Sequence, residues 1–257
     1  MPNERGQTID KTYLSINNAE KRLFLHRDYI AHCLRWSHII KYLQEKQRYK
    51  NSRVLDIGCG KEAPLLKTLY TSRLLPYHYL GIDYGKITIL ETIPSLNTDK
   101  ISGHFALYPE TNILDFEPNE CYTPEVIVML EVLEHVEKDM GIEVLKHIKY
   151  FMDKDSVLFL STPCYDGVNK AANHVYEWQY GELAATFTDL GYILVNVWGT
   201  FASLKDYIHC IPAEWLPVFN HLRTYYDVNV LSCIFAPIFP AQSRNCLWQL
   251  RKEEVSG

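Results

Sequence analysis

The chain lacks the features that would tie it to a membrane, a disulfide framework or a polyanion. No uncharged apolar run approaches the roughly eighteen residues that a membrane span needs, and no signal peptide is apparent. The seven cysteines are irregularly spaced and form no CxxC pair, which is typical of reduced thiols rather than a zinc or redox motif. The net charge of −5 gives no overall attraction to nucleic acid or anionic lipid. We therefore expect a soluble, cytoplasmic protein without a membrane partner, and only a local basic patch would permit RNA binding.

Length and hydrophobic content fit one α/β domain with additions. The chain has 257 residues, and 47% of them are apolar, which is enough for a full core. Apolar strand patterns alternate with amphipathic helix patterns along the middle of the chain, and this alternation predicts a mostly parallel sheet with helices on both faces. The expected strands are 53–57, 79–83, 103–107, 125–129, 156–161 and 192–199, and the expected helices between them are 62–74, 86–93, 138–152 and 179–190.

Two further segments flank this alternating unit. Residues 1–48 form a polar tail and a helical cap, because apolar residues recur at helical spacing from about 20 to 47. We place the core at 49–201. Residues 202–257 then comprise a lid-like insertion, 202–244, and a final core strand, 245–252. The insertion contains an expected helix at 213–224 and a proline-containing loop at 235–240.

The most informative motif is a tight turn after the first expected strand. Asp56 is followed by Gly58, Cys59 and Gly60, an order that lets a nucleotide-like ligand approach the backbone closely. Dinucleotide-binding turns share the two glycines, but they cradle an anionic pyrophosphate that a carboxylate would repel. Asp56 therefore favours a ligand with a positive end, such as the amino group and sulfonium of S-adenosylmethionine.

With this motif the sequence resembles the class I S-adenosylmethionine-dependent methyltransferases, whose first motif reads roughly hhDhGxGxG. Lys61 and Glu62 stand where a third glycine would come. The resemblance implies a Rossmann-like, seven-stranded sheet whose last strand runs antiparallel beside the sixth. It also implies that Asp56, Gly58, Cys59 and Gly60 line the methionine half of the cofactor.

Two later acids extend the expected cofactor site. Asp83 ends the second strand some twenty residues after the glycine turn, where a carboxylate accepts hydrogen bonds from ribose hydroxyls. Tyr84 is then a candidate wall of the adenine pocket. Family resemblance places Asp115, after the third strand, near the adenine amino group, with a solvated loop aspartate as the alternative.

The reacting end is expected after the fourth and fifth strands. Glu131, Glu134 and His135 have i, i+3 and i+4 spacing, so one helical turn would present all three on one side. His174 follows the fifth strand. Because clefts in doubly wound sheets open at the carboxyl ends of strands, these side chains can converge on a divalent cation such as Mg, Mn, Fe or Zn.

The pattern E-x-x-E-H with a later H-x-x-E-W resembles the small-RNA 3′-terminal 2′-O-methyltransferases, in which a metal grips both terminal ribose hydroxyls. By resemblance, Glu131, Glu134, His135 and His174 would be the metal ligands and the catalytic residues, and Glu131 also borders the cofactor. The run 130–136 equally resembles the ubiquinone-pathway O-methyltransferases, which act on catechol-like diols.

Three interpretations of these four residues stay open: a metal site, a metal-free site with His135 as base or substrate contact, and a structural role. We expect O-methylation of a small-molecule or nucleotide-like acceptor. Metal-dependent RNA 2′-O-methylation and an idle cofactor-binding scaffold are the alternatives. The sequence does not indicate an oligomeric state.

Overall fold

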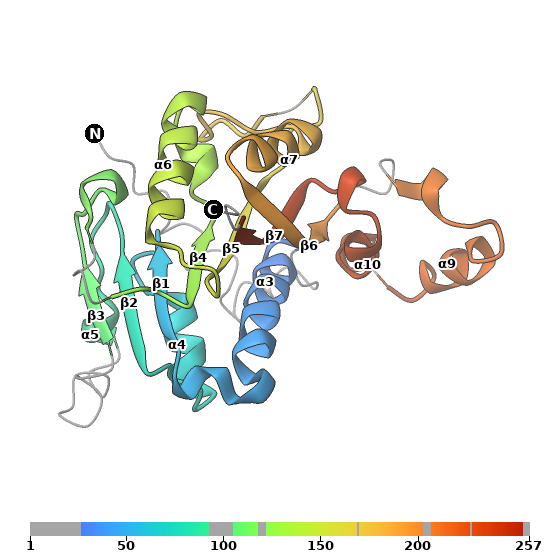
Figure 1. Ribbon diagram of the computed structural model, residues 1–257. Helices are drawn as coiled ribbons and strands as arrows, with labels where there is room; N and C mark the ends of the chain where they lie inside the picture. The colour runs from blue at the N-terminus through green and yellow to red at the C-terminus, as the bar shows by residue number, and fades with distance from the viewer. Residues whose placement is uncertain are drawn as a thin grey trace.

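The fold is a seven-stranded sheet between two layers of helices, seen in a computed structural model that describes residues 27–92, 105–117, 122–168, 170–202, 207–226 and 228–253 (Figure 1). The strand order is β3-β2-β1-β4-β5-β7-β6. Strand β7 runs antiparallel to both of its neighbours, and the other pairs are parallel, so the expected Rossmann-like sheet is confirmed. The strands are β1 (Arg53–Ile57), β2 (His78–Ile82), β3 (Phe105–Tyr108), β4 (Val126–Leu130), β5 (Val157–Pro163), β6 (Tyr192–Phe201) and β7 (Asn245–Lys252).

The register of the parallel strands creates one functional edge. Ile57 of β1 lies beside Ile82 of β2 and Met129 of β4, so the three strands end at the same level. The strands are short, apolar and buried, as expected for strands covered on both faces. The glycine turn, Asp83 and Glu131 follow these strand ends directly and therefore meet at one edge.

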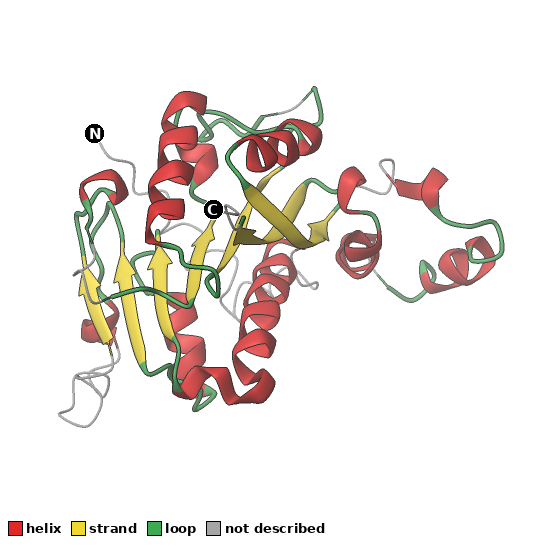
Figure 2. Cartoon of the chain, viewed as in Figure 1, coloured by secondary structure: helices red, strands yellow, loops and turns green. Residues whose placement is uncertain are grey.

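Helices cover both faces of the sheet (Figure 2). On one face, α6 (Lys138–Phe151) and α7 (Tyr180–Asp189) pack on a core that includes Met129 and Leu160. On the other face lie α3 (Arg27–Gln44), α4 (Pro64–Thr71) and α5 (Ile89–Thr92). The sequence predicts each of these helices within a few residues. Helix α4 begins two residues later than expected, at Pro64, and ends three residues earlier, at Thr71. Expected residues 20–26, 93, 103 and 104 lie outside the described residues.

The segment between β6 and β7 forms a lobe with a hydrophobic cluster of its own, which includes Tyr207, Phe219 and Leu231. It contains α9 (Leu216–Leu222) and α10 (Val228–Phe235) and extends away from the sheet (Figure 1). Helix α10 is missing from the sequence prediction, and the expected loop at 235–240 instead ends α10 and continues in 3-10 turns.

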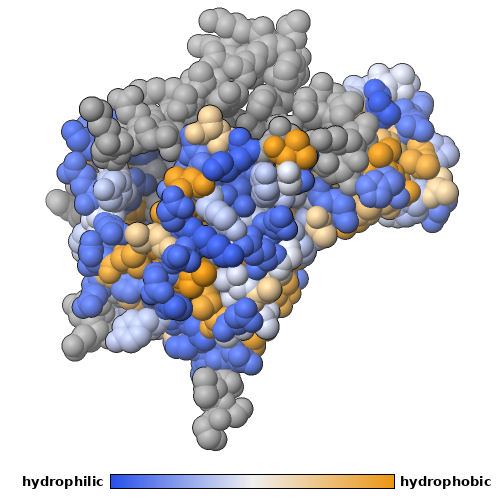
Figure 3. Space-filling model, turned by 90° about the horizontal axis from the view of Figure 1, so that it is seen from above, coloured by the Kyte–Doolittle hydropathy of each residue, from blue (hydrophilic) through white to orange (hydrophobic). Residues whose placement is uncertain are grey.

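Several apolar side chains remain exposed on this lobe, and hydrophobic colour gathers there in Figure 3. They include Trp215, Val218, Tyr225, Tyr226, Ile234 and Ile238. The lid role of the lobe stays a prediction. Within the described ranges, no helix is both long and apolar enough to span a membrane.

Candidate active site

The glycine turn is built as the sequence predicts. Gly58 and Gly60 both have left-handed backbone angles, with φ of 70° and 77°. The backbone N–H groups of Gly58 and Cys59 donate to the carbonyl of Ile82, at 2.8 and 3.1 Å, which fixes the turn to the end of β2. A Cβ on Gly58 would lie 2.3 Å from Cγ2 of Val132. Glycine is therefore required both by conformation and by the close approach of the segment after β4.

Asp56 lies behind the turn, buried, and accepts a hydrogen bond from the Tyr79 hydroxyl of β2. Burial raises the pKa of Asp56 to about 7, against the lowering effect of the Tyr79 hydrogen bond and with a further increase from Asp83. A positively charged ligand group beside the turn would favour the ionised carboxylate. The contact of Asp56 with a cationic ligand stays a prediction.

Asp83 connects the end of β2 to the glycine turn through a hydrogen bond of its side chain, and a second one closes a local turn. Its carboxylate accepts from the N–H of Gly60 at 2.8 Å and from the N–H of Gly85 at 2.7 Å. The neighbouring Tyr84 is 66% exposed, and Asp115 is exposed in a short turn that Asn112 caps. The contacts of Asp83, Tyr84 and Asp115 with ribose and adenine stay predictions.

The segment after β4 differs from the expected helical turn. Glu131 adopts a left-handed φ of 58°, and a 3-10 turn then covers Leu133–His135. A helix cannot continue through Glu131, so the expected single helical turn over Glu131, Glu134 and His135 is not formed. Glu134 and His135 do face a common site.

Glu131 is held by a network from three other elements. Its carboxylate accepts from the Ser161 hydroxyl of β5 at 2.6 Å and from the Asn245 amide of β7 at 3.0 Å, and Arg35 Nη1 of α3 lies 3.6 Å away. Burial raises the pKa of Glu131, but Arg35, His32 and these two hydrogen bonds outweigh it and hold the pKa below its usual range. Glu131 is therefore a fixed anion at the end of β4.

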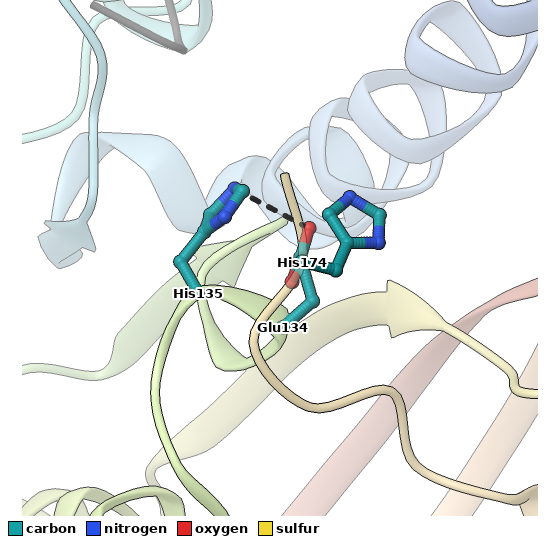
Figure 4. A group of neighbouring side chains, drawn as sticks. All are labelled: Glu134, His135 and His174. Atoms are coloured by element: carbon teal, nitrogen blue, oxygen red, sulfur yellow. Dashed lines mark ion pairs between the residues drawn. The ribbon is translucent and has the colours of Figure 1, made fainter. Parts of the chain in front are cut away.

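Glu134, His135 and His174 form a second, separate group (Figure 4). One ligand atom from each lies within 4.8 Å of the others, and Nε2 of His135 is 3.9 Å from Oε1 of Glu134. Glu134 is buried and accepts a hydrogen bond from Thr162 at 3.2 Å. Burial, followed by the negative charge of Glu131, raises the pKa of Glu134 well above its ordinary value.

Both histidines direct Nδ1 toward a fixed oxygen. His174 Nδ1 is 2.5 Å from the Glu177 carboxylate, which accepts only and therefore fixes the proton on Nδ1. His135 Nδ1 is 3.3 Å from the backbone carbonyl of Asn173. With Nδ1 donating to that oxygen, Nε2 of each ring is the atom that would ligate a metal ion, as in many metal-binding histidines.

This donor set fits a divalent transition ion. Two neutral imidazoles and one carboxylate suit Zn, Mn or Fe, with positions left for an acceptor. Such an ion would also offset the burial of the Glu134 carboxylate. Glu131 does not join this group of described residues.

Several functional candidates carry no motif in the sequence. Arg35, Ser161 and Asn245 reach Glu131 only because α3, β5 and β7 fold onto β4. Tyr79 reaches Asp56 through the pairing of β1 with β2. Among these supporting residues, only Glu177 belongs to a sequence motif, because it is the acid of the H-x-x-E-W run that begins at His174.

Comparisons with known proteins agree on the fold. The chain matches the family described as "Methyltransferase domain" over residues 26–207. Among solved structures, it is similar to the small RNA methyltransferase HEN1, with a TM-score of 0.59 and 20% identity, over 88% of this chain and 26% of that one. The chain thus spans about a quarter of that protein.

Two small-molecule enzymes have the same fold. A Burkholderia thailandensis 1,6-didemethyltoxoflavin-N1-methyltransferase with bound S-adenosylhomocysteine gives a TM-score of 0.55 at 13% identity, over 86% of this chain and 79% of that one. A Synechocystis magnesium protoporphyrin IX methyltransferase gives 0.56 at 11% identity, over 96% and 100%. No curated protein matches the chain.

Proposed function

Since the chain belongs to the S-adenosylmethionine-dependent methyltransferase domain family, we propose that it methylates one hydroxyl of a vicinal diol on a ribose-like acceptor, which a divalent cation holds. The observation that carries this proposal is the convergence of Glu134, His135 and His174 beside the end of β4. Nδ1 of each histidine contacts an oxygen, of Asn173 or of Glu177. A carboxylate with two oriented imidazoles is a donor set suited to an ion that also binds oxygen.

The reaction needs little beyond positioning, because the sulfonium methyl is already activated. The acceptor oxygen attacks the methyl carbon, the carbon–sulfur bond breaks, and S-adenosylhomocysteine and a methyl ether form. The hydroxyl proton is released to solvent. A bound cation lowers the pKa of a hydroxyl that it coordinates. Glu134, His135 and His174 place the diol, and the glycine turn places the donor in line with it.

A ribose with free 2′ and 3′ hydroxyls supplies the required diol, either in a nucleotide or at the 3′ end of RNA. The similarity to small RNA methyltransferase HEN1 supports the RNA end. The net charge of −5 supports a smaller acceptor. Both sources present the same chemistry to the cluster, so the experiment below separates them.

A second candidate is metal-free methylation with His135 as the base. It is favoured by one observation: Nδ1 of His135 contacts the Asn173 carbonyl, an arrangement in which Nε2 can act as the base, and the side chain is 35% exposed. In that case a hydroxyl proton passes to Nε2, and no cation is needed.

The test is transfer of labelled methyl from S-adenosylmethionine, with Mn²⁺ or with a chelator. The acceptors are an RNA oligonucleotide ending in a 2′,3′-diol, the same oligonucleotide with a 3′-phosphate, and free nucleosides and nucleotides. We expect label in diol-ended acceptors, none in the phosphorylated RNA, and loss of transfer with chelator.

Each contrary result identifies the part of the proposal that fails. Chelator-resistant transfer would favour His135 as a base, and equal labelling of the phosphorylated RNA would refute the diol. Cofactor binding without transfer to any acceptor, including fractionated cell extract, would favour an idle scaffold.

A further inference from the structure

We infer that Glu131 belongs to the methyl donor's positive methionine end and not to the cation's ligand set, and that Arg35 of α3 is the positioning residue that holds it there. This inference rests on the proposed function. It also separates this chain from the four-ligand pattern that the sequence resembles, in which Glu131 would be a ligand beside Glu134.

The first support is how the two carboxylates are held. Glu131 Oε1 accepts from Ser161 at 2.6 Å, and the Asn245 amide lies 3.0 Å from both carboxylate oxygens. These contacts come from β5 and β7 and engage both carboxylate oxygens. The metal-ligand group found among the described residues comprises Glu134, His135 and His174 without Glu131. Its backbone φ of 58° is also a strained conformation, of the kind that persists at functional sites when the surroundings enforce it.

The second support is the placement of Arg35. Its guanidinium is 2% exposed, lies 3.6 Å from Glu131, and donates from Nη1 to the Asn245 side chain at 2.9 Å. Nη2 lies 2.9 Å from Nδ1 of His32, one turn earlier in α3. The same guanidinium thus orients Glu131 and the amide that binds it, which links the helical cap to the end of β4.

The third support is the position of Glu131 beside the glycine turn. The next residue, Val132, packs so closely on Gly58 that a Cβ there would clash. Strands β1 and β4 are also direct neighbours in the sheet. Glu131 therefore borders the turn that family resemblance assigns to the methionine half of the cofactor, and its side chain is still 23% exposed. A preorganised anion at this position suits an ammonium or sulfonium group.

The experiment measures three affinities by calorimetry in Arg35→Ala, Glu131→Gln and Glu134→Gln. The probes are S-adenosylmethionine, 5′-methylthioadenosine, which lacks the charged amino-acid end, and Mn²⁺ alone. We expect Arg35→Ala and Glu131→Gln to weaken S-adenosylmethionine binding about tenfold or more, as for loss of a charge-assisted contact. Binding of 5′-methylthioadenosine should change less than about twofold, the size of an indirect effect.

For Mn²⁺ binding we expect the opposite order of effects in the two glutamate variants. Glu134→Gln should weaken it about 10- to 100-fold, whereas Glu131→Gln should leave it unchanged. Arg35→Lys should recover part of the S-adenosylmethionine affinity, because a lysine restores the charge without the fork geometry. Arg53→Ala is the matched control, since it breaks an Arg–Glu pair with Glu125 at the opposite edge of the sheet and should leave all three affinities unchanged.

Equal loss of Mn²⁺ binding in Glu131→Gln and Glu134→Gln would overturn the inference, because Glu131 would then be a ligand. Unchanged S-adenosylmethionine affinity in Arg35→Ala, or equal loss for both nucleoside probes, would reduce Arg35 to a structural residue. If the wild-type protein binds no Mn²⁺, the cation of the proposed function fails, while the two nucleoside probes still decide the role of Arg35.

Discussion

Replacing Asp56 by asparagine should stabilise the ligand-free protein at neutral and alkaline pH while weakening cofactor binding. Burial raises the pKa of Asp56 from 3.8 to about 7, although Tyr79 donates a hydrogen bond to it. Between these two values the folded protein retains a proton that the unfolded chain has released. Stability of the wild-type protein therefore falls as pH rises through that window and levels off above about pH 7.

The magnitude follows from the shift. About three pKa units correspond to roughly 4 kcal/mol above pH 7, of which about 2–3 kcal/mol develops between pH 5 and pH 8. Asparagine keeps the shape and the acceptor for Tyr79 but has no charge to bury. The stability advantage of Asp56→Asn over the wild type should therefore grow by about 2–3 kcal/mol from pH 5 to pH 8.

The assay is urea denaturation of both proteins without cofactor at pH 5, 6, 7 and 8. Tyr79→Phe provides a control in the opposite direction, because removing the donor should raise the pKa of Asp56 further and extend the fall in stability to higher pH. Parallel curves for the wild type and Asp56→Asn would refute the reasoning, since they would show that Asp56 does not retain a proton in the folded state.

Three further predictions concern single contacts. Gly58→Ala should lower the free energy of unfolding by about 2–4 kcal/mol, because the new Cβ overpacks against Val132 and the backbone at Gly58 is left-handed. In the same denaturation assay, adding Val132→Ala should recover only the loss caused by overpacking. Full recovery of stability in the double variant would contradict the backbone strain. Asp83→Ala should weaken S-adenosylmethionine binding at least about tenfold by calorimetry, because the charged acceptor of two backbone N–H groups is lost. Undiminished affinity would refute the assignment of Asp83 to the cofactor ribose. Glu177→Gln should weaken Mn²⁺ binding about 10- to 100-fold through His174 and spare the cofactor, and an unchanged Mn²⁺ titration would argue against an oriented imidazole.

The sequence predicts the sheet well because each strand carries its own local signal. The run at 53–57 is an apolar strand ended by a glycine turn, and β1 covers those residues. Helix α10 was missed because the prolines that follow it suggest a loop, whereas the packing of Leu231 in the lobe's cluster favours a helix.

One part of the candidate site is predictable from the sequence and another part is not. The proximity of Glu134, His135 and His174 is predictable, because these residues follow neighbouring strand ends and only the topology is needed to place them together. The position of Glu131 was not predictable, because its left-handed backbone is enforced by contacts with Arg35 and Asn245. Those partners lie far along the chain, and no spacing rule connects them to Glu131.

The lobe between β6 and β7 also has a consequence for how the chain folds. These two strands form a long antiparallel ladder, yet roughly forty residues separate them, where a tight hairpin would need a few. Closing such a loop costs about 2 kcal/mol more than closing a hairpin, because the entropy grows with the logarithm of loop length. The ladder should therefore form more slowly than a tight hairpin of the same length. Asn245, the first residue of β7, arrives with it, so the amide that binds Glu131 is in place only once this loop has closed.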